Sequence, residues 1–309
     1  LSQRRLSEPC LTETQLDDVE ALLAEIVDSV EQVRGDGIEA VGVGIPGPVE
    51  FETGRLRSAP NLPLHDMPLR KVLSKRIGLP VYVDNDATVA ALAEASDGDR
   101  IAVRNLVMFT VGTGVGGGLV LRGRVYRGAT GAAGELGQTL IGADLVSGAP
   151  EPGHYPRPGS LETLAAGTAL DRLVAELAAS EPGSALGRRA AEQGHVEGPD
   201  AVELAKQGDE GARRVIRVLG ERLGIGIANA INTFDPDEIV IGGGVSAAGD
   251  LLLEPARKTA RDFALTGVGT ETKIRLARHG PRAGVLGAAL LGHLELEAER
   301  SESGAGGES

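Results

Sequence analysis

Apolar residues follow two kinds of pattern along the chain, one typical of helices and the other of buried strands. Over Leu16–Val33 they recur at intervals of three and four residues, which predicts an amphipathic helix. Thr12 and Gln15 have the spacing of a capping box and predict that this helix begins beside them. The run Ala40–Ile45 is short and apolar, and Pro46–Pro48 closes it, which indicates a buried strand that ends in a rigid turn. A helix followed by a buried strand indicates α/β layering.

Polar residues stand where another predicted strand ends. Pro68–Gly78 has the proline start and glycine end of a helix, and the apolar run Val81–Val83 follows as a strand. Ala87–Ala95 is a helix-forming run, so Asp84–Asp86 lie where a strand passes into a helix. Such residues are typical helix caps, and spacing alone favours that interpretation over a functional one.

Two glycine-rich segments also follow predicted strands. Gly112–Gly118 holds five glycines in seven residues and lies between the apolar runs Leu106–Val111 and Leu119–Leu121, which indicates a strand-loop-strand unit. Its backbone N–H groups could bind a phosphate, although a flexible hairpin turn explains the same pattern equally well. Gly242–Gly244 follows the strand Glu238–Ile241 and could border a nucleotide or form only a tight turn.

Two sets of glycines have the spacing of a dinucleotide-binding fingerprint, but neither is followed by the helix that the fingerprint requires. Gly42, Gly44 and Gly47 match the spacing G-x-G-x-x-G, but a proline and a hairpin-like segment follow where that fingerprint needs a helix. Gly112–Gly118 is followed by an apolar strand instead of a helix, and the chain has no Walker sequence G-x-x-x-x-G-K-[ST]. Rossmann and P-loop interpretations are therefore rejected.

The second half of the chain is predicted to be mostly helical. Leu161–Gln193 and Ala201–Phe234 form the longest helical regions, Leu251–Phe263 returns to helix, and a final helix covers roughly Gly284–Glu299. Residues 301–309 consist of Ser, Glu, Gly and Ala alone, so we expect a disordered tail.

Composition narrows the class of protein. A length of 309 residues favours two packed lobes. The formal net charge of -13 repels nucleic-acid phosphates, so a small-molecule partner is expected and no nucleic acid. Cys10 is the only cysteine, which excludes an intramolecular disulfide and a cysteine-rich zinc site. The sequence has no run of about 18 apolar residues and residues 1–12 lack the pattern of a signal peptide, so no membrane association and a cytoplasmic location are expected.

Six segments occur in an order that carries a family resemblance. They are Gly42–Pro48, Ala59–Pro63, Asp84–Ala87, Val111–Gly118, Gly134–Gly137 and Ile241–Val245. In this order they resemble the ROK family of bacterial sugar kinases and regulators, which belongs to the hexokinase and actin-like ATPase class. The resemblance implies an α/β, two-lobed actin-like ATPase (ribonuclease H-like) fold. It implies a small N-terminal lobe over residues 1–104, joined by the returning helix 283–300, and a large lobe over residues 105–282.

The same resemblance implies the roles of individual residues. By this resemblance Asp86 corresponds to the general base. A carboxylate suits that role because it can accept the proton of a sugar hydroxyl. Glu135 and Glu162, which singly would be ordinary solvated or capping carboxylates, become sugar-binding residues. The implied sugar contacts are Asn61, Asn85, Glu135, Gln138 and Glu162. The implied contacts to ATP are Gly112, Thr113, Gly114, Gly116, Gly117, Gly118, Gly243 and Gly244, and Mg²⁺ would accompany the nucleotide.

The sequence departs from the family pattern in two places. Gln138 stands where the family commonly has histidine, and Gly153, Tyr155 and Ser160 stand at the cysteine positions of a zinc loop, so we expect no structural zinc. No Asp-x-Gly-Gly-Thr phosphate loop precedes the first helix, so we expect the N-terminal strands and the first phosphate loop to be missing and the chain to be a fragment.

The implied function is an ATP-dependent hexose kinase, with glucokinase as the first hypothesis and a homo-oligomer, a dimer or a tetramer, as the expected assembly. Fructose, mannose and N-acetylated amino sugars remain open as substrates, because one or two pocket contacts decide among them. Two alternatives are kept. One is a fragment of a ROK-type, sugar-sensing transcriptional regulator, and the other is a sugar-binding pseudokinase.

Overall fold

The computed structural model describes residues 10, 12, 14, 16, 18–59 and 62–305, with side chains as far as residue 303. The chain divides into two compact units. The first consists of residues 1–104, 118–134 and 278–309, and the second of residues 105–117 and 135–277. The sequence predicts a continuous large lobe over 105–282, whereas this division assigns 118–134 and 278–282 to the first unit.

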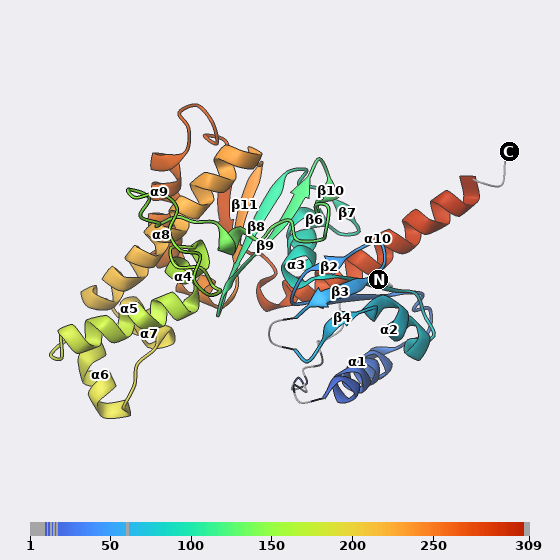
Figure 1. The fold of residues 1–309 in the computed structure, drawn as a ribbon, viewed down its shortest axis with the longest axis horizontal. Helices are drawn as coiled ribbons and strands as arrows, with labels where there is room; N and C mark the ends of the chain where they lie inside the picture. The colour runs from blue at the N-terminus through green and yellow to red at the C-terminus, as the bar shows by residue number, and fades with distance from the viewer. Residues whose placement is uncertain are drawn as a thin grey trace. The chain divides into compact units, whose positions relative to one another are not determined.

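The first unit is built on two parallel strands, β1 (Val41–Ile45) and β5 (Val81–Asn85), with helices on both faces (Figure 1). Successive side chains of a strand point to opposite faces. Val81 and Val83 accordingly pack in one core with α1 (Val19–Val33) and α2 (Leu69–Ile77). Tyr82 faces the other way and packs in a second core with α3 (Asp86–Ala95) and α10 (Ala283–Ala305). The apolar run that indicated a buried strand is therefore buried from two sides.

Glycine at position 42 allows α10 to lie directly against β1. A Cβ atom on Gly42 would stand 1.7 Å from the carbonyl oxygen of Ala288, which belongs to the backbone of the helix. Gly287 faces α3 in the same way, since its Cβ would stand 1.7 Å from the carbonyl oxygen of Val89. The glycines of the rejected dinucleotide pattern thus include one that serves close packing. The segment after β1 leads into strand β2 (Val49–Glu50) and not into a helix, which confirms the rejection.

Smaller sheets complete the first unit. An antiparallel sheet has the order β2-β3-β4, with β3 over Arg55–Ser58 and β4 over His65–Met67. A short hairpin joins β6 (Ser96–Asp97) to β7 (Arg100–Ile101), and β10 (Arg124–Val125) pairs with the end of β9.

The second unit is built on the strands β8 (Leu106–Val111), β11 (Glu238–Gly242) and β12 (Lys273–Leu276), which pair in parallel with β11 in the middle. Strand β9 (Val115–Leu121) forms a hairpin with β8, as the strand-loop-strand pattern predicted, and it passes from the second unit into the first after Gly117.

Helices make up most of the rest of the second unit. They are α4 (Leu161–Ala165), α5 (Gly167–Ser180), α6 (Ala185–Gln193), α7 (Gly198–Lys206), α8 (Glu210–Phe234) and α9 (Asp250–Phe263). The long helices α8 and α9 lie side by side (Figure 1). In the described part of the chain, no helix is both long enough and apolar enough to cross a membrane.

Two predicted helix boundaries are wrong. Helix α1 begins at Val19 instead of near Thr12, because the carboxylate of Asp18 accepts a hydrogen bond from the backbone N–H of Ala21 and caps the helix there. Gln15 of the expected capping box lies outside the described residues. Helix α10 continues to Ala305, so residues 301–305 of the expected disordered tail are helical, and the remainder of that tail lies outside the described residues.

Candidate functional site

The junction between β5 and α3 carries the predicted base. Asn85 caps α3, because its Oδ1 accepts hydrogen bonds from the N–H groups of Ala87 (3.0 Å) and Thr88 (3.2 Å). Its Nδ2 donates to the carbonyl oxygen of Gly47 at 3.2 Å. Asp86 occupies the first turn, is exposed, and accepts a hydrogen bond on Oδ1 from the N–H of Ala87 at 2.8 Å. The cap interpretation is therefore correct for Asn85, and it leaves the Asp86 carboxylate at the surface.

Asp84 has a different environment, which the sequence did not indicate. It is only 3% exposed. Its Oδ1 accepts a hydrogen bond from the N–H of Asn85 at 2.9 Å, and its Oδ2 accepts one from Nε of Arg127 at 2.7 Å. Burial raises the pKa of Asp84 above its ordinary value, and the charge and hydrogen bond of Arg127 oppose that rise. Because Arg127 lies 43 positions away, no local pattern could have predicted this ion pair.

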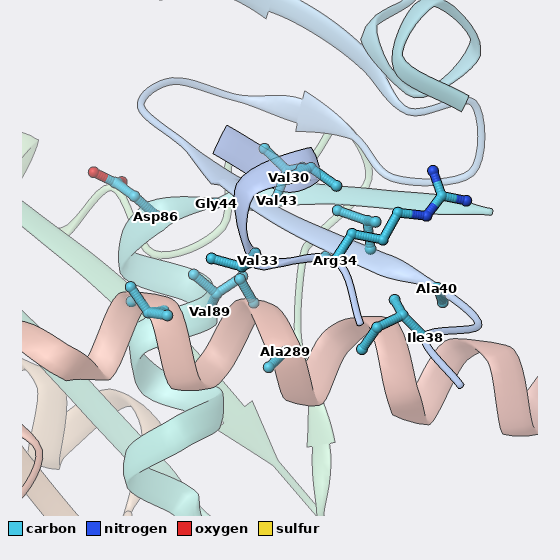
Figure 2. Close-up of a pocket in the computed structure, with 15 residues that line it drawn as sticks. Val30, Val33, Arg34, Ile38, Ala40, Val43, Gly44, Asp86, Val89 and Ala289 are labelled. Carbon is cyan, nitrogen blue, oxygen red and sulfur yellow. The ribbon is translucent and has the colours of Figure 1, made fainter. Parts of the chain in front are cut away.

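A largely apolar cavity of about 460 Å³ adjoins this junction. Figure 2 shows residues of α1, such as Val30 and Val33, together with Val43 of β1 and Ala289 of α10 around this cavity, with the Asp86 carboxylate and the Arg34 guanidinium at opposite ends. The lining residues are Val30, Val33, Arg34, Ile38, Ala40, Val41, Gly42, Val43, Gly44, Asp86, Val89, Gly284, Val285, Ala288 and Ala289. Asp86 thus stands at the edge of an apolar wall.

The glycine loop of the second unit is held by Glu162. The loop turns between β8 and β9, where the N–H of Gly112 donates to the carbonyl oxygen of Gly114 at 2.9 Å. The N–H of Val115 donates to Oε2 of Glu162 at 2.8 Å. A Cβ on Gly114 would stand 2.4 Å from that same carboxylate oxygen, so only glycine allows this approach without a shift. The carboxylate that the resemblance assigns to the sugar is therefore bound to the predicted phosphate loop.

Gln138 lies against the same carboxylate. Its Nε2 donates to Oε1 of Glu162 at 3.3 Å, and its own Oε1 is buried and has no hydrogen-bond partner among the described residues. Gln138 ends the short 3-10 helix Leu136–Gln138, and Glu162 lies in the first turn of α4, which Ser160 caps. The structure thus brings two predicted sugar-binding residues together in the second unit. Glu135 is exposed and immediately precedes the 3-10 helix.

The carboxyl ends of β8 and β11 meet the start of a helix. The N–H of Gly167, the first residue of α5, donates to the carbonyl oxygen of Gly112 at 2.7 Å. Gly243 has φ 85° and follows β11, and a Cβ there would stand 2.3 Å from the carbonyl oxygen of Val111. Gly244 begins a short 3-10 helix. A helix N-terminus beside glycine turns at the carboxyl edge of a parallel sheet favours binding of an anion.

The other predicted contacts have varied positions. Gly116–Gly118 belong to β9 and not to the loop, and a Cβ on Gly118 would stand 2.5 Å from the carbonyl oxygen of Ala87. The exposed Thr113 lies in the loop, where its carbonyl oxygen accepts a hydrogen bond from Oγ1 of Thr168 at 3.2 Å. Asn61 lies outside the described residues. The predicted roles of these residues toward ATP or sugar stay predictions.

No group of three His, Cys, Asp or Glu side chains among the described residues is placed to hold a metal ion. The expectations of nucleotide-borne Mg²⁺ and of no structural zinc both stay predictions.

The chain is similar to known proteins over most of its length. The profile of the ROK family matches residues 1–295. A glucokinase from Halalkalibacterium halodurans is 37% identical over 251 residues, which cover 81% of this chain and 75% of that protein. A xylose repressor from Caldicellulosiruptor bescii is 31% identical over 287 residues, which cover 88% of this chain and 68% of the repressor. The crystal structure of a ROK family glucokinase from Streptomyces griseus, in complex with glucose and AMPPNP, is 32% identical with a TM-score of 0.74, covering 89% of this chain and 88% of that one.

Proposed function

The chain belongs to the ROK family, and on that premise we propose that it is an ATP-dependent hexose kinase that converts glucose to glucose 6-phosphate. The observation that carries the proposal is the exposed carboxylate of Asp86, held at the carboxyl end of a parallel strand pair by the cap that Asn85 provides. The similarity to a glucokinase crystallised with glucose and AMPPNP supports both the sugar and the nucleotide.

In the proposed reaction Asp86 accepts the proton of the sugar 6-hydroxyl as that oxygen attacks the γ-phosphorus of ATP. The bond between the γ-phosphorus and the bridging oxygen breaks, and ADP leaves. The backbone N–H of Ala87 donates to Oδ1 of Asp86 and orients the carboxylate, which would accept the hydroxyl proton. Phosphoryl transfer needs mainly positioning and neutralisation of charge, and Mg²⁺ bound to the nucleotide would supply part of that neutralisation.

The glycine loop and the start of α5 are proposed to bind the phosphates of ATP. The loop at Gly112–Gly114 turns between β8 and β9, Gly243 follows β11, and the N-terminus of α5 adds a partial positive charge. Glu162 and Gln138 are proposed to bind sugar hydroxyls. The buried Oε1 of Gln138 can accept a hydrogen bond from such a hydroxyl, which would satisfy an atom that otherwise has no partner in the described structure.

A coupled ADP-release assay with glucose, fructose, mannose and N-acetylated amino sugars tests the proposal. We expect glucose to give the highest kcat/KM, with the product identified as the 6-phosphate by ³¹P NMR. Size-exclusion chromatography with light scattering of the same sample tests the predicted homo-oligomer. If no hexose stimulates ADP release, the kinase proposal is wrong.

Similarity to a xylose repressor favours a second candidate, a sugar-sensing protein that binds its ligand without phosphorylating it. Isothermal titration calorimetry separates the two candidates. Binding of glucose or xylose with no ADP release would favour the sensor, whereas binding together with turnover would favour the kinase.

A further inference from the structure

The guanidinium of Arg127 contacts two carboxylates and one aromatic ring, which come from three different parts of the first unit. Its Nε donates to Oδ2 of Asp84 at 2.7 Å, and its Nη2 lies 3.4 Å from Oε1 of Glu295 in α10. The centre of its guanidinium lies 3.4 Å from the centroid of the Phe51 ring, at the turn between β2 and β3. One side chain therefore joins β5, α10 and this turn within the first unit.

The Asp84–Arg127 ion pair is buried enough to hold its geometry. The side chain of Asp84 is 4% exposed and that of Arg127 is 19% exposed. Removing one partner of a buried ion pair leaves an uncompensated charge, which is strongly destabilising. At Arg127, the partly exposed partner, solvent reduces that cost. The pair is thus largely shielded from solvent, unlike an ordinary surface bridge.

Asp84 transmits this contact to the base-bearing turn. The carboxylate oxygen that does not contact Arg127 accepts the N–H of Asn85 at 2.9 Å. Oδ1 of Asn85 in turn accepts hydrogen bonds from the N–H groups of Ala87 and Thr88 in the first turn of α3. The carboxylate of Asp86 lies between these hydrogen-bonded groups, so its direction depends on where Asp84 holds the strand.

The segment after Arg127 is also anchored. The carbonyl oxygen of Arg127 accepts the N–H of Ala133 at 3.1 Å, which closes a turn. Gly131 in this turn lies so close to β2 that a Cβ would stand 1.8 Å from the carbonyl oxygen of Val49. The chain then leaves the first unit after Gly134, and the next residue is Glu135.

We propose that Arg127 is a positioning residue for phosphoryl transfer, which acts through Asp84 to orient the turn that carries Asp86. This inference rests on the proposed kinase function. Lysine cannot replace Arg127 here, because an ammonium group lacks the planar fork that donates to a carboxylate while stacking on an aromatic ring. The role is one of geometry, so its loss affects turnover more than substrate binding.

The test uses Arg127→Lys, Asp84→Asn and the double variant, assayed for kcat and for the KM of glucose and ATP. We expect each single variant to lower kcat by about ten-fold or more while each KM stays within about two-fold. Because both residues act through one contact, the double variant should be no slower than the slower single variant. Losses of kcat that multiply in the double variant would overturn the inference.

Amide hydrogen exchange supplies a readout that does not depend on activity. We expect the N–H groups of Ala87 and Thr88 to exchange faster in both single variants than in the wild type. Arg189→Lys is the matched control, since Arg189 is also 19% exposed and bridges two carboxylates, those of Asp200 and Glu203, in the second unit. It should leave kcat and these exchange rates unchanged.

The outcomes separate this inference from the proposed function. Unchanged exchange at Ala87 and Thr88, or an unchanged kcat in an active enzyme, contradicts a positioning role for Arg127. If the wild type phosphorylates no hexose, the proposed function fails. The exchange rates alone then decide whether Arg127 positions this turn.

Discussion

Replacing Gly42 by alanine should destabilise the first unit strongly, although it adds only a methyl group. The new Cβ would lie 1.7 Å from the carbonyl oxygen of Ala288, 2.6 Å from its carbonyl carbon and 3.1 Å from the nitrogen of Gly292. All three atoms belong to the backbone of α10, so no side chain can rotate away and the helix must shift by more than an ångström. Overpacking commonly costs about 1–3 kcal/mol. Because backbone must move here, we expect at least about 3 kcal/mol, or roughly a 100-fold loss in the folding equilibrium.

Urea denaturation followed by circular dichroism measures this loss. Gly284→Ala is the matched control, because it adds the same methyl group within α10 itself, at a position where no described residue beyond the neighbouring helix backbone lies within 4 Å of the new Cβ. The control should keep or slightly increase stability, since alanine favours helix over glycine by about 1 kcal/mol. If Gly42→Ala unfolds at the same urea concentration as the control, α10 does not lie against β1 as closely as the structure shows.

Two further predictions concern carboxylates outside the candidate site. Burial alone would raise the pKa of Glu238, but its hydrogen bond and charge contact with Arg275 lower it below the ordinary value of 4.5, so its stabilisation is present above that pH and is lost as pH falls through the lowered pKa. Glu238→Gln should therefore reduce the acid dependence of stability below about pH 4.5, and an unchanged slope in urea titrations would contradict this. Glu94 is fully buried and its Oε1 accepts the N–H of His279 at 2.9 Å, with Arg278 Nε 3.6 Å from Oε2. Glu94→Gln should cost about 1.5–3 kcal/mol in the same assay, and a change below about 0.5 kcal/mol would show that the charge is not needed.

The sequence predicted those parts of the fold that local patterns determine. Pro68 and Gly78 bound α2 as expected, because a proline fits the start of a helix and Gly78 adopts the left-handed conformation, φ 74°, that ends it. The position of Asp84–Asp86 between a strand and a helix was also predicted, because polar residues that separate a buried apolar run from a helix-forming run are typical of such a junction. The start of α1 was wrong, since Thr12 and Asp18 are both good caps and only the folded chain shows which one is used.

The candidate site could be predicted only in part, because its most constrained contacts join residues distant in sequence. Glu162 was singled out, but its hydrogen bond to the N–H of Val115 spans 47 positions and has no local signal. The same holds for Arg127. Its contact with Asp84 spans 43 positions, and the residues around it in the sequence carry no signal of that contact. Gly116–Gly118 had the composition of a loop, yet pairing with β8 makes them part of a strand. Strand pairing and contacts between residues distant in sequence therefore determine the structure of the site where local composition alone does not.

The kinase account is tested most directly by the turnover of Asp86→Asn with glucose and ATP. The substitution keeps the size of an exposed side chain, so stability should change by less than about 0.5 kcal/mol. Glucose binding, measured by calorimetry, should persist, while kcat falls by about 100-fold or more because amide oxygen is a far weaker proton acceptor than carboxylate. A variant that binds glucose and turns it over at nearly the wild-type rate would show that Asp86 is not the base.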